Sequence, residues 1–402
     1  MTKMRLLVIG NGMAGLKFIE EISALDGDAF EITVAGEEPD IAYNRVLLSP
    51  LLAGEISVQD VRMKPLEWYS ARGIRLITGD AVAALDTAAR TAALASGRTV
   101  AFDICVFATG SNPIRLPLPG ADLPGVEVFR TTQDIARLVA AAQRGEDAVV
   151  IGGGLLGIEA AYGLKRAGAR VTLVHVMDRL MERQLDREGA GILRAALEAK
   201  GITVVLSADT ACIAGNAMAE KLLLKDGTEI PAHLVVMAVG VRPRIDLAAA
   251  SGITCKRGIA VDDRMETSVQ NVFAIGECAE HRGAVYGLVE PAYEHARIAA
   301  NVIAGRTASY EGSVLATNLK VSGLPVFSTG DFEGAGCEII AWRDAVSSSY
   351  RKFAIRDGKL AGAVLVGDTT DALWYRDLIR SGQSIAPFRQ FLAFGRAYAE
   401  AA

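Results

Sequence analysis

The sequence has few cysteines, and they form none of the patterns that bind metals or build disulfide frameworks. Among its 402 residues there are five, Cys105, Cys212, Cys255, Cys278 and Cys337. They lie far apart, and no two stand in a C-x-x-C spacing. This argues against a disulfide framework, a zinc site and a cysteine-ligated iron–sulfur cluster. We therefore expect reduced, mostly structural thiols and no bound metal.

Long apolar runs are also missing. The stretch from Val149 to Leu164 is interrupted by Glu159, whereas a membrane-spanning helix needs about 18 consecutive apolar residues. Near the N-terminus the apolar run ends at Asn11 and Gly12, too early for the core of a signal peptide. These absences predict a cytoplasmic protein that does not span a membrane.

The chain lacks a large excess of charge of either sign. It has 42 Lys and Arg against 47 Asp and Glu, a net charge of −5, and 51% of its residues are hydrophobic. This profile excludes a disordered chain and argues against a nucleic-acid surface. The length predicts about two to three domains, each with its own core. Glycine is abundant, at 41 residues, and suits α/β layers in which the backbone approaches a ligand.

What the sequence does contain is one glycine-rich pattern, twice. Arg5 to Ile9 is typical of a buried strand, and a helical stretch to Ser23 follows the loop Gly10-Asn11-Gly12-Met13-Ala14-Gly15. A strand over 148–151 and an Ala-rich helix likewise flank Gly152-Gly153-Gly154-Leu155-Leu156-Gly157. In this pattern the first glycine makes the turn, the second admits a pyrophosphate, and the third lets helix pack on strand. Two such loops predict two bound dinucleotides, a flavin and a nicotinamide.

Each loop should be followed, after the next strand, by an acid that binds a ribose hydroxyl. In the first copy Glu31–Ala35 reads as the strand, and Glu37 and Glu38 follow it. In the second copy Arg170–Val174 is the strand, and His175 stands where an acid is expected. Neutral histidine neither anchors a ribose as a carboxylate does nor repels a 2′-phosphate. The sequence therefore leaves NADH and NADPH both open.

The chain resembles the FAD-dependent pyridine nucleotide reductases, flavoproteins built like glutathione reductase, over roughly residues 4–305. The resemblance rests on Val106-Phe107-Ala108-Thr109-Gly110, Val239-Gly240 and Phe273-Ala274-Ile275-Gly276-Glu277, where the family usually has Asp at the last position. It implies an α/β fold with two Rossmann-like domains, one inserted in the other. The FAD-binding domain would span 1–113 and 244–309, the NAD(P)H-binding domain 114–243, and a small C-terminal α+β domain 310–402.

Further segments are similar to the flavin module of NAD(P)H nitrite reductase large subunits and of assimilatory nitrate reductase electron-transfer subunits. These segments are Gly36–Pro39, Tyr43–Ser49, Met181–Asp186, Gly276–Gly283 and Leu360–Asp368.

The resemblance also implies which residues bind the cofactors. FAD would be held by the first loop (Gly10, Asn11, Gly12, Met13, Ala14, Gly15) and by Glu37, Glu38, Asn44, Arg45, Val82, Ala108, Thr109, Gly110, Arg130, Gly276, Glu277, Glu290 and Pro291. NADH or NADPH would be held by Gly152, Gly154, Leu155, Leu156, Gly157, His175 and Gly240. Glu159 matches a carboxylate near the contact of nicotinamide and flavin, and is the one catalytic candidate; the alternative is a surface acid near the start of a helix.

Disulfide reductases of this fold carry a cysteine pair soon after the first ribose-binding acid, but no cysteine precedes Cys105 here. Electrons would therefore leave the flavin for an external acceptor. Cys278 is expected to be a small buried residue without a redox role. The first hypothesis is an electron-transfer component for an iron–sulfur or molybdenum partner, most simply an assimilatory nitrate or nitrite reductase. The alternatives are a free-standing ferredoxin or rubredoxin reductase and an FAD- and NAD-binding redox sensor with little turnover.

The C-terminal segment has its own pattern. Tyr350–Arg356 and Lys359–Val366 alternate around Asp357-Gly358, which predicts a β-hairpin. A helix bearing Trp374 should follow, with Trp374 in the core rather than at an acceptor. In the resembled family this domain covers the flavin and often mediates association, which leaves monomer and homo-oligomer open.

Overall fold

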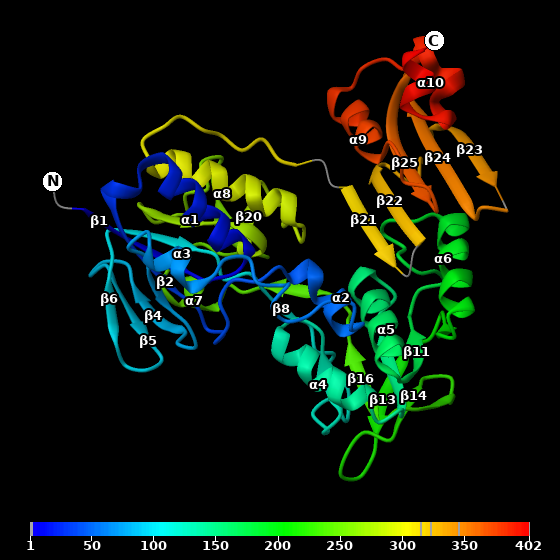
Figure 1. Ribbon diagram of the computed structural model, residues 1–402, viewed down its shortest axis with the longest axis horizontal. Helices are drawn as coiled ribbons and strands as arrows, with labels where there is room; N and C mark the ends of the chain where they lie inside the picture. Colours follow the sequence, from blue (N-terminus) through cyan, green and yellow to red (C-terminus); the bar gives the residue numbers. More distant parts are fainter. Residues whose placement is uncertain (1–2, 314–315, 322–323, 345, 402) are drawn as a thin grey trace. The chain divides into compact units, whose positions relative to one another are not determined.

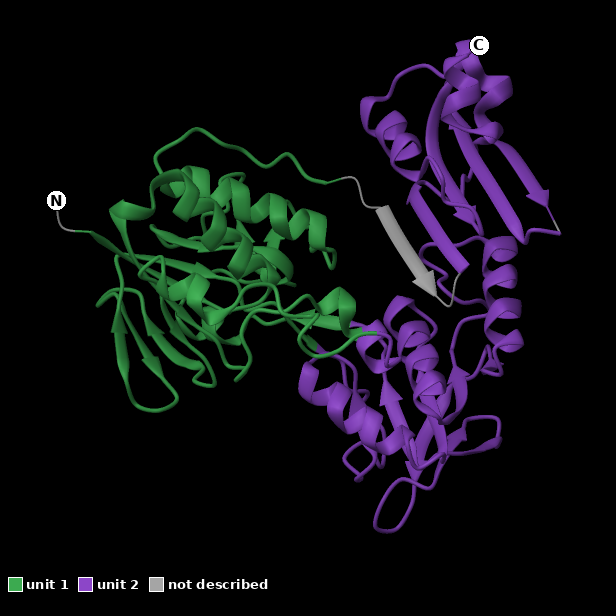
Figure 2. Ribbon diagram, in the orientation of Figure 1, with its two compact units in different colours: residues 1–48, 56–112, 241–313 green, residues 49–55, 113–240, 314–402 purple. Residues whose placement is uncertain are grey.

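The computed structural model describes residues 3–313, 316–321, 324–344 and 346–401. The chain forms two compact units, each made of separate sequence segments (Figure 2). Unit 1 comprises residues 1–48, 56–112 and 241–313, and unit 2 comprises 49–55, 113–240 and 314–402. One Rossmann-like region is thus inserted in the other. Residues 49–55, which the predicted boundaries assign to the FAD-binding domain, group with unit 2.

Unit 1 is built on a parallel sheet with strand order β19-β7-β1-β2-β3 (Figure 1). Its strands are β1 (Met4–Ile9), β2 (Phe30–Ala35), β3 (Arg75–Ile77), β7 (Ile104–Phe107) and β19 (Val272–Ala274). They are largely apolar because both faces are covered. On one face, α1 (Met13–Asp26) packs against α8 (Val289–Ile303), where alanines such as Ala296 and Ala299 let the helices approach closely.

The other face of this sheet carries a second hydrophobic cluster, which includes Phe102, Leu85 and Ala274. A three-stranded antiparallel sheet contributes to it, with strands β4 (Val82–Asp86), β5 (Thr91–Leu94) and β6 (Thr99–Ala101). Two short strands, β8 (Ser111–Pro113) and β17 (Val241–Pro243), pair where the chain crosses between the units.

Unit 2 repeats this plan. Its parallel sheet has the order β12-β11-β10-β16-β9, with strands β9 (Val126–Val128), β10 (Asp147–Ile151), β11 (Arg170–Val174), β12 (Thr203–Val205) and β16 (Leu234–Met237). Read from the other end, β16-β10-β11-β12 match β7-β1-β2-β3 of unit 1, whereas the edge strand β9 precedes the others in the chain and the edge strand β19 follows them. An antiparallel sheet is again present, made of β13 (Thr210–Ala214), β14 (Lys221–Leu224) and β15 (Glu229–Pro231). Its helices are α4 (Thr132–Ala142), α5 (Leu155–Ala167) and α6 (Arg187–Ala199).

The C-terminal part of unit 2 is an antiparallel sheet of order β21-β22-β25-β24-β23. Its strands are β21 (Ala316–Val321), β22 (Leu324–Gly330), β23 (Glu338–Asp344), β24 (Ser349–Arg356) and β25 (Lys359–Val366), followed by α9 (Ala372–Ser381), η4 (Ala386–Phe394) and α10 (Arg396–Glu400). The predicted hairpin is confirmed: Asp357 and Gly358 have φ of 51° and 69°, as its two-residue turn requires. Trp374 packs partly buried against the core of this domain, as predicted.

The C-terminal sheet is anchored on α6, within unit 2. Asp186 caps the N-terminus of α6 by accepting the Gly189 N–H at 3.1 Å. Its other carboxylate oxygen accepts the Tyr350 hydroxyl at 2.7 Å and lies 3.2 Å from Lys352 Nζ. Tyr350 and Lys352 both belong to β24, so one carboxylate joins a helix cap to the sheet.

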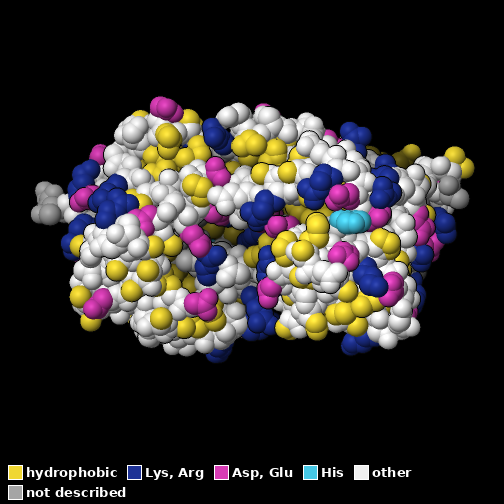
Figure 3. All heavy atoms as spheres, turned by 90° about the horizontal axis from the view of Figure 1, so that it is seen from below, with side chains coloured by type: hydrophobic (Ala, Val, Ile, Leu, Met, Phe, Trp, Pro, Cys, Tyr) yellow, Lys and Arg dark blue, Asp and Glu magenta, His cyan; other side chains and the backbone are white. Residues whose placement is uncertain are grey.

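The predicted fold class is confirmed by this architecture. In the part of the chain that the structure describes, no helix combines the length and apolar character needed to cross a membrane. Nor do the described residues include three His, Cys, Asp or Glu side chains grouped as a metal site. On the face drawn in Figure 3, Lys and Arg side chains are interspersed with Asp and Glu.

Candidate functional site

The first glycine loop (residues 10–15) joins β1 to α1. Gly10 has a φ of +114°, and a Cβ there would lie 2.2 Å from the carbonyl oxygen of Ala108. A Cβ on Gly15 would lie 2.3 Å from the carbonyl oxygen of Gly10. Gly12, by contrast, has nothing within 4 Å of its Cβ position. Gly10 and Gly15 are thus required by close backbone packing, whereas Gly12 leaves open space at the start of α1.

The second glycine loop (residues 152–157) repeats these contacts between β10 and α5. Gly152 has a φ of +123°, and its Cβ would lie 2.4 Å from the carbonyl oxygen of Ala238. A Cβ on Gly157 would lie 1.9 Å from the carbonyl oxygen of Gly152, whereas Gly154 is open. In both loops the open glycine is the helix N-cap, beside N–H groups that no helical carbonyl can reach. Each loop therefore fits the pyrophosphate of a dinucleotide.

The predicted loop neighbours lie at the same helix starts. Met13 and Ala14 are the first two residues of α1, and Leu155 and Leu156 are the first two of α5. Asn11 lies beside the end of β2, where its side-chain Oδ1 accepts the Tyr69 hydroxyl at 3.1 Å.

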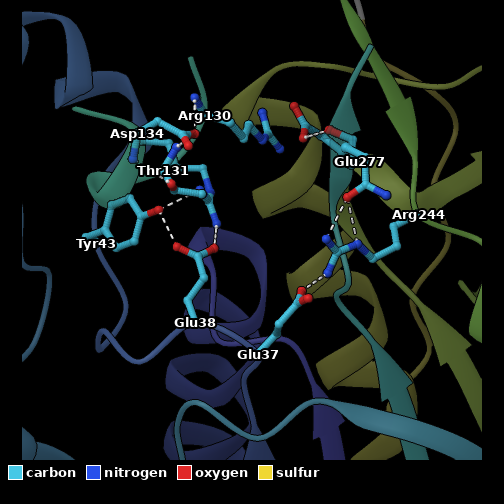
Figure 4. A network of polar contacts seen from close by, with 11 residues as sticks. Glu37, Glu38, Tyr43, Arg130, Thr131, Asp134, Arg244 and Glu277 are labelled. Atoms are coloured by element: carbon cyan, nitrogen blue, oxygen red, sulfur yellow. Dashed lines mark hydrogen bonds and ion pairs between the residues drawn. The ribbon is translucent and has the colours of Figure 1, made fainter. Parts of the chain in front are cut away.

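Both acids after β2 are engaged by arginines of unit 1 (Figure 4). The half-exposed Glu37 pairs with Arg244, which also donates to Asn112 Oδ1 at 2.6 and 2.8 Å. Glu38 pairs with Arg45 and accepts the Tyr43 hydroxyl at 2.6 Å. Of the two, Glu37 is the more exposed carboxylate and is therefore better placed for a ribose.

Arg45 lies in a strongly polar setting. Burial lowers the pKa of its guanidinium, but the Tyr43 oxygen, Glu38 and Glu277 raise it more, so the pKa stands above its ordinary value. Arg45 therefore keeps its positive charge in the predicted flavin site. The preceding residue, Asn44, accepts the Val46 N–H at 3.0 Å with its side chain.

The segment containing Gly276 and Glu277 lies against the first glycine loop. Gly276 has a φ of +74°, and its Cβ would be 2.8 Å from the Cβ of Ala14. Glu277 accepts the Ser111 hydroxyl at 2.7 Å, so its carboxylate faces the 108–111 segment. Cys278 is fully buried, and burial raises the pKa of its thiol, as expected for a structural cysteine.

The Ala108-Thr109-Gly110 segment is held by Arg244. Thr109 Oγ1 donates to the Arg244 carbonyl at 2.9 Å, and the Arg244 N–H donates to the Gly110 carbonyl at 2.9 Å. In unit 2, Gly240 has a φ of +118° and accepts the Ile114 N–H at 2.9 Å.

Val82 begins β4. The turn before it is hydrogen-bonded to the segment that carries Glu37 and Glu38. The Gly79 N–H donates to the Glu38 carbonyl at 2.9 Å, and the Asp80 N–H to the Gly36 carbonyl at 3.1 Å. This places Val82 near the predicted ribose acids.

The remaining predicted FAD residues lie at two helix starts. Glu290 and Pro291 are in the first turn of α8, with Glu290 exposed and Pro291 buried. Arg130 precedes the capping box that Thr131 and Asp134 form at the start of α4. For these residues a contact with FAD stays a prediction.

His175 does not occupy the position that matches Glu37. The strand registers align Ile9 with Ala35 and Ile151 with Val174, so His175 corresponds to Gly36 and Val176 to Glu37. The sequence-based placement at the acid position is therefore off by one residue. The position matching Glu37 carries the exposed, uncharged Val176.

Glu159 lies in α5 close to the second glycine loop. It is partly buried, and burial raises the pKa of its carboxyl to about 7, with the Ser49 hydroxyl partly opposing the shift. Ser49 belongs to the 49–55 segment of unit 2, and its Oγ is buried. A carboxyl that titrates near neutral pH can hold or release a proton there. A contact of Glu159 with the nicotinamide and flavin stays a prediction.

Sequence reasoning missed several residues of these sites. Arg244 meets Glu37 across 207 positions, and Ser49 reaches Glu159 from another segment. His295 is buried beside Gly276. The one available signal was the Arg242-Pro243-Arg244 stretch that follows Gly240.

Comparisons with known proteins give two family matches. Residues 4–301 match the family described as pyridine nucleotide-disulphide oxidoreductase. Residues 316–383 match the rubredoxin NAD+ reductase C-terminal domain.

Two relatives come from Bacillus subtilis (strain 168). A nitrite reductase [NAD(P)H] is 46% identical over 92% of this chain and 46% of its own length. An assimilatory nitrate reductase electron transfer subunit is 44% identical over 92% of this chain and 48% of its own. The chain thus spans about half the length of both.

Among solved structures, a ferredoxin reductase from Rhodopseudomonas palustris superposes with a TM-score of 0.87. It is 26% identical, and the match covers 95% of each chain.

Proposed function

The chain belongs to the pyridine nucleotide-disulphide oxidoreductase family, and on that premise we propose that it delivers electrons from NAD(P)H to a separate redox partner protein. The family and its relatives make the chain an FAD-dependent NAD(P)H oxidoreductase. When bound, FAD supplies the group that accepts hydride from the nicotinamide and releases electrons.

One observation carries the proposal of an external acceptor: the state of the cysteines in unit 1. All five cysteines of the chain are free, and Cys105, Cys255 and Cys278 are the three in unit 1. Burial raises the pKa of each of these three thiols, which keeps them protonated and unreactive. With no reactive dithiol near the first glycine loop, the electrons have to go to another molecule.

The proposed roles follow the two loops. In unit 1, the first loop takes the FAD pyrophosphate at Gly12, Glu37 binds the ribose, and Arg45 and Glu277 supply polar contacts to the flavin. In unit 2, the second loop takes the NAD(P)H pyrophosphate at Gly154. Glu159 holds a proton on its carboxyl near neutral pH.

For the acceptor, we favour a partner holding iron–sulfur or molybdenum centres in nitrite or nitrate assimilation, and a cytoplasmic location. The two Bacillus relatives, which are 46% and 44% identical, support this acceptor.

The test is anaerobic reduction of purified, flavin-loaded protein by NADH and by NADPH, followed by addition of one acceptor at a time. We expect bleaching of the flavin band by at least one nucleotide. We also expect faster reoxidation by a nitrate reductase catalytic subunit than by ferredoxin or rubredoxin. Protein that binds no flavin, or whose flavin does not bleach, would contradict the proposal.

A second candidate is a free-standing reductase of ferredoxin or rubredoxin. The match of residues 316–383 to a rubredoxin NAD+ reductase domain and the likeness to a ferredoxin reductase support it. A clear preference for ferredoxin or rubredoxin in the same acceptor panel would select this candidate.

A further inference from the structure

Two of the four histidines in the chain are buried against the backbone N–H of a glycine: Gly153, within the second glycine loop, and Gly276, a predicted FAD-binding residue. They are His175 in unit 2, which is 8% exposed, and His295 in unit 1, which is fully buried. In both, the contacting ring atom is Nδ1. Each unit thus has a buried histidine that accepts a glycine N–H, at the glycine loop in unit 2 and at the Gly276 turn in unit 1.

The His175 ring packs against the second glycine loop and accepts a hydrogen bond from it. The Gly153 N–H donates to His175 Nδ1 at 3.0 Å. Because a backbone N–H can only donate, Nδ1 is the acceptor and a neutral ring carries its proton on Nε2. Nε2 lies 3.0 Å from Glu182 Oε2 and donates to it. The Gly153 carbonyl accepts the Met181 N–H at 2.9 Å, so the residue is held on both sides.

The loop also packs closely against the His175 ring. A Cβ on Gly153 would lie 2.6 Å from two ring carbons of His175. The imidazole therefore fills the space beneath the loop, and only glycine at position 153 lets it do so. The hydrogen bond and the packing both act on the residue between Gly152 and Gly154.

His295 plays the corresponding part in unit 1. The Gly276 N–H donates to His295 Nδ1 at 3.3 Å. The ring lies on α8 with the Tyr310 ring 4.5 Å away, and its Nε2 has no hydrogen-bond partner among the described residues. Burial, with a smaller contribution from His281, lowers the pKa of His295 to about 4 and keeps the ring neutral. A neutral ring is what the contact with Gly276 requires.

The Gly276 peptide is in turn pressed against the first glycine loop through Ala14. An apolar side chain in place of His295 would leave the Gly276 N–H buried without an acceptor. The turn would then relax away from the start of α1.

We propose that His295 and His175 are positioning residues, His295 for the FAD-binding turn and His175 for the NAD(P)H-binding loop. Each fixes one glycine N–H through Nδ1, and neither acts by touching the cofactor. The inference rests on the cofactor sites proposed above.

The test compares Leu and Asn variants of each histidine in the full chain. Leucine removes the acceptor, whereas the Asn side-chain oxygen can take the place of Nδ1. FAD affinity is measured by titrating flavin-free protein and following flavin fluorescence, and the KM for NADH and NADPH is measured on FAD-saturated protein. We expect His295→Leu to weaken FAD binding by about five- to tenfold without changing the nucleotide KM. We expect His175→Leu to raise the nucleotide KM by a similar factor, with FAD affinity and kcat unchanged. Each Asn variant should restore most of the loss.

The other two histidines provide matched controls. His281 is also buried in unit 1, but its Nε2 lies 2.8 Å from Asp263 Oδ1 rather than at a glycine turn. His233 lies in unit 2 between β15 and β16. His281→Leu should leave FAD affinity unchanged, and His233→Leu should leave the nucleotide KM unchanged. Thermal unfolding of every variant monitors folding.

Leu variants that bind their cofactor as the wild type does would overturn the inference. So would Asn variants that lose affinity as the Leu variants do, because the role would then be packing alone. A wild-type chain that binds no FAD would overturn the proposed sites themselves, and this outcome is distinct from a failure of the histidines.

Discussion

The two glycine-loop modules share their backbone contacts and differ in the side chains around them. In both, the first glycine meets a carbonyl of the neighbouring strand end, the third meets the first, and the middle one is open. The side chain that fills the space between the loop and the end of the second strand belongs to the loop in one unit and to the strand end in the other. In unit 1 it is Asn11 of the loop, facing Gly36, and in unit 2 it is His175 of the strand end, facing Gly153. The glycine contacts are thus the same in both loops, whereas the side chain that packs against each loop differs.

A second difference lies on the helix that follows. Two residues after the third glycine, α1 has Lys17, which pairs with Glu21 at 2.5 Å and stays partly exposed. The matching residue of α5 is Glu159, which is also only partly buried but whose carboxyl is desolvated enough to raise its pKa to about 7. A solvated pair needs no function, but a buried acid is costly to keep. The contrast supports a role for Glu159 beyond structure.

The strongest test of the shared backbone is Gly157→Ala. A Cβ 1.9 Å from the Gly152 carbonyl oxygen cannot be accommodated without moving the loop from the helix. We expect the free energy of unfolding to fall by about 3 kcal/mol or more. We also expect the variant to lose NAD(P)H binding. Chemical denaturation measures the loss. Gly191→Ala is the control, since its Cβ would meet nothing within 4 Å, and it should not destabilise α6.

Gly154→Ala separates binding from folding. The residue has φ −82° and ψ −178°, which alanine adopts readily, and its Cβ would point into open space. We expect unchanged stability, within about 0.5 kcal/mol, but a KM for NAD(P)H raised at least about tenfold, because a methyl group would block the pyrophosphate. Steady-state kinetics and thermal melts check both parts. An unchanged KM would show that the loop does not bind the pyrophosphate there.

Glu159→Gln addresses the difference between the helices. Because the folded-state pKa of this acid, about 7, lies above its ordinary 4.5, the folded state binds the proton more tightly than the unfolded state. Wild-type stability should therefore fall as pH rises from about 4.5 to 7, by roughly 3 kcal/mol in all. The Gln variant should lack this fall and gain relative stability above pH 7. Unfolding curves at several pH values measure it.

A control for the buried acid is Glu198→Gln on α6, which removes an exposed pair with Arg194. It should change stability by less than about 0.5 kcal/mol at any pH. If Glu159→Gln also changes the free energy of unfolding by less than about 0.5 kcal/mol at every pH, then Glu159 contributes no more to the pH dependence of stability than an exposed acid does.

The smallest expected effect concerns the uncharged position that matches Glu37. Val176→Glu would give unit 2 the acid that unit 1 has, at a side chain that is already exposed. A carboxylate accepts hydrogen bonds from a free ribose hydroxyl and repels a 2′-phosphate. We expect the ratio of kcat/KM for NADH to that for NADPH to rise about tenfold, which corresponds to about 1.4 kcal/mol. Val176→Gln, which lacks the charge, should shift the ratio much less.

Local patterns in the sequence predicted the features that depend on neighbouring residues. The two loops, the strands beside them and the hairpin at Asp357-Gly358 all follow from glycine positions and alternation over a few residues. The open site at Gly12 and Gly154 follows as well, because the same spacing has the same steric cause in both copies.

The features that escaped prediction depend on register or on distant segments. The prediction placed His175 at the acid position because it directly follows the second strand of its copy, whereas in the first copy one glycine lies between the strand and Glu37. The strand pairing is what assigns His175 to the Gly36 position. The pair of Glu37 with Arg244 and the approach of Ser49 to Glu159 arise only when distant segments meet, and no local pattern encodes them.

The nesting of the segments also has a consequence for synthesis on the ribosome. The strands β2 and β7 that pair with β1 lie within residues 30–107, but the core around β1 also includes Phe273 of β19 and Ala296 and Ala299 of α8, which are made much later. The inserted sheet of unit 2 has all its strands within 126–237 and can close first. The core of unit 1 is thus completed only after the inserted sheet, and the face of β1 that α8 covers is the part left waiting in that interval.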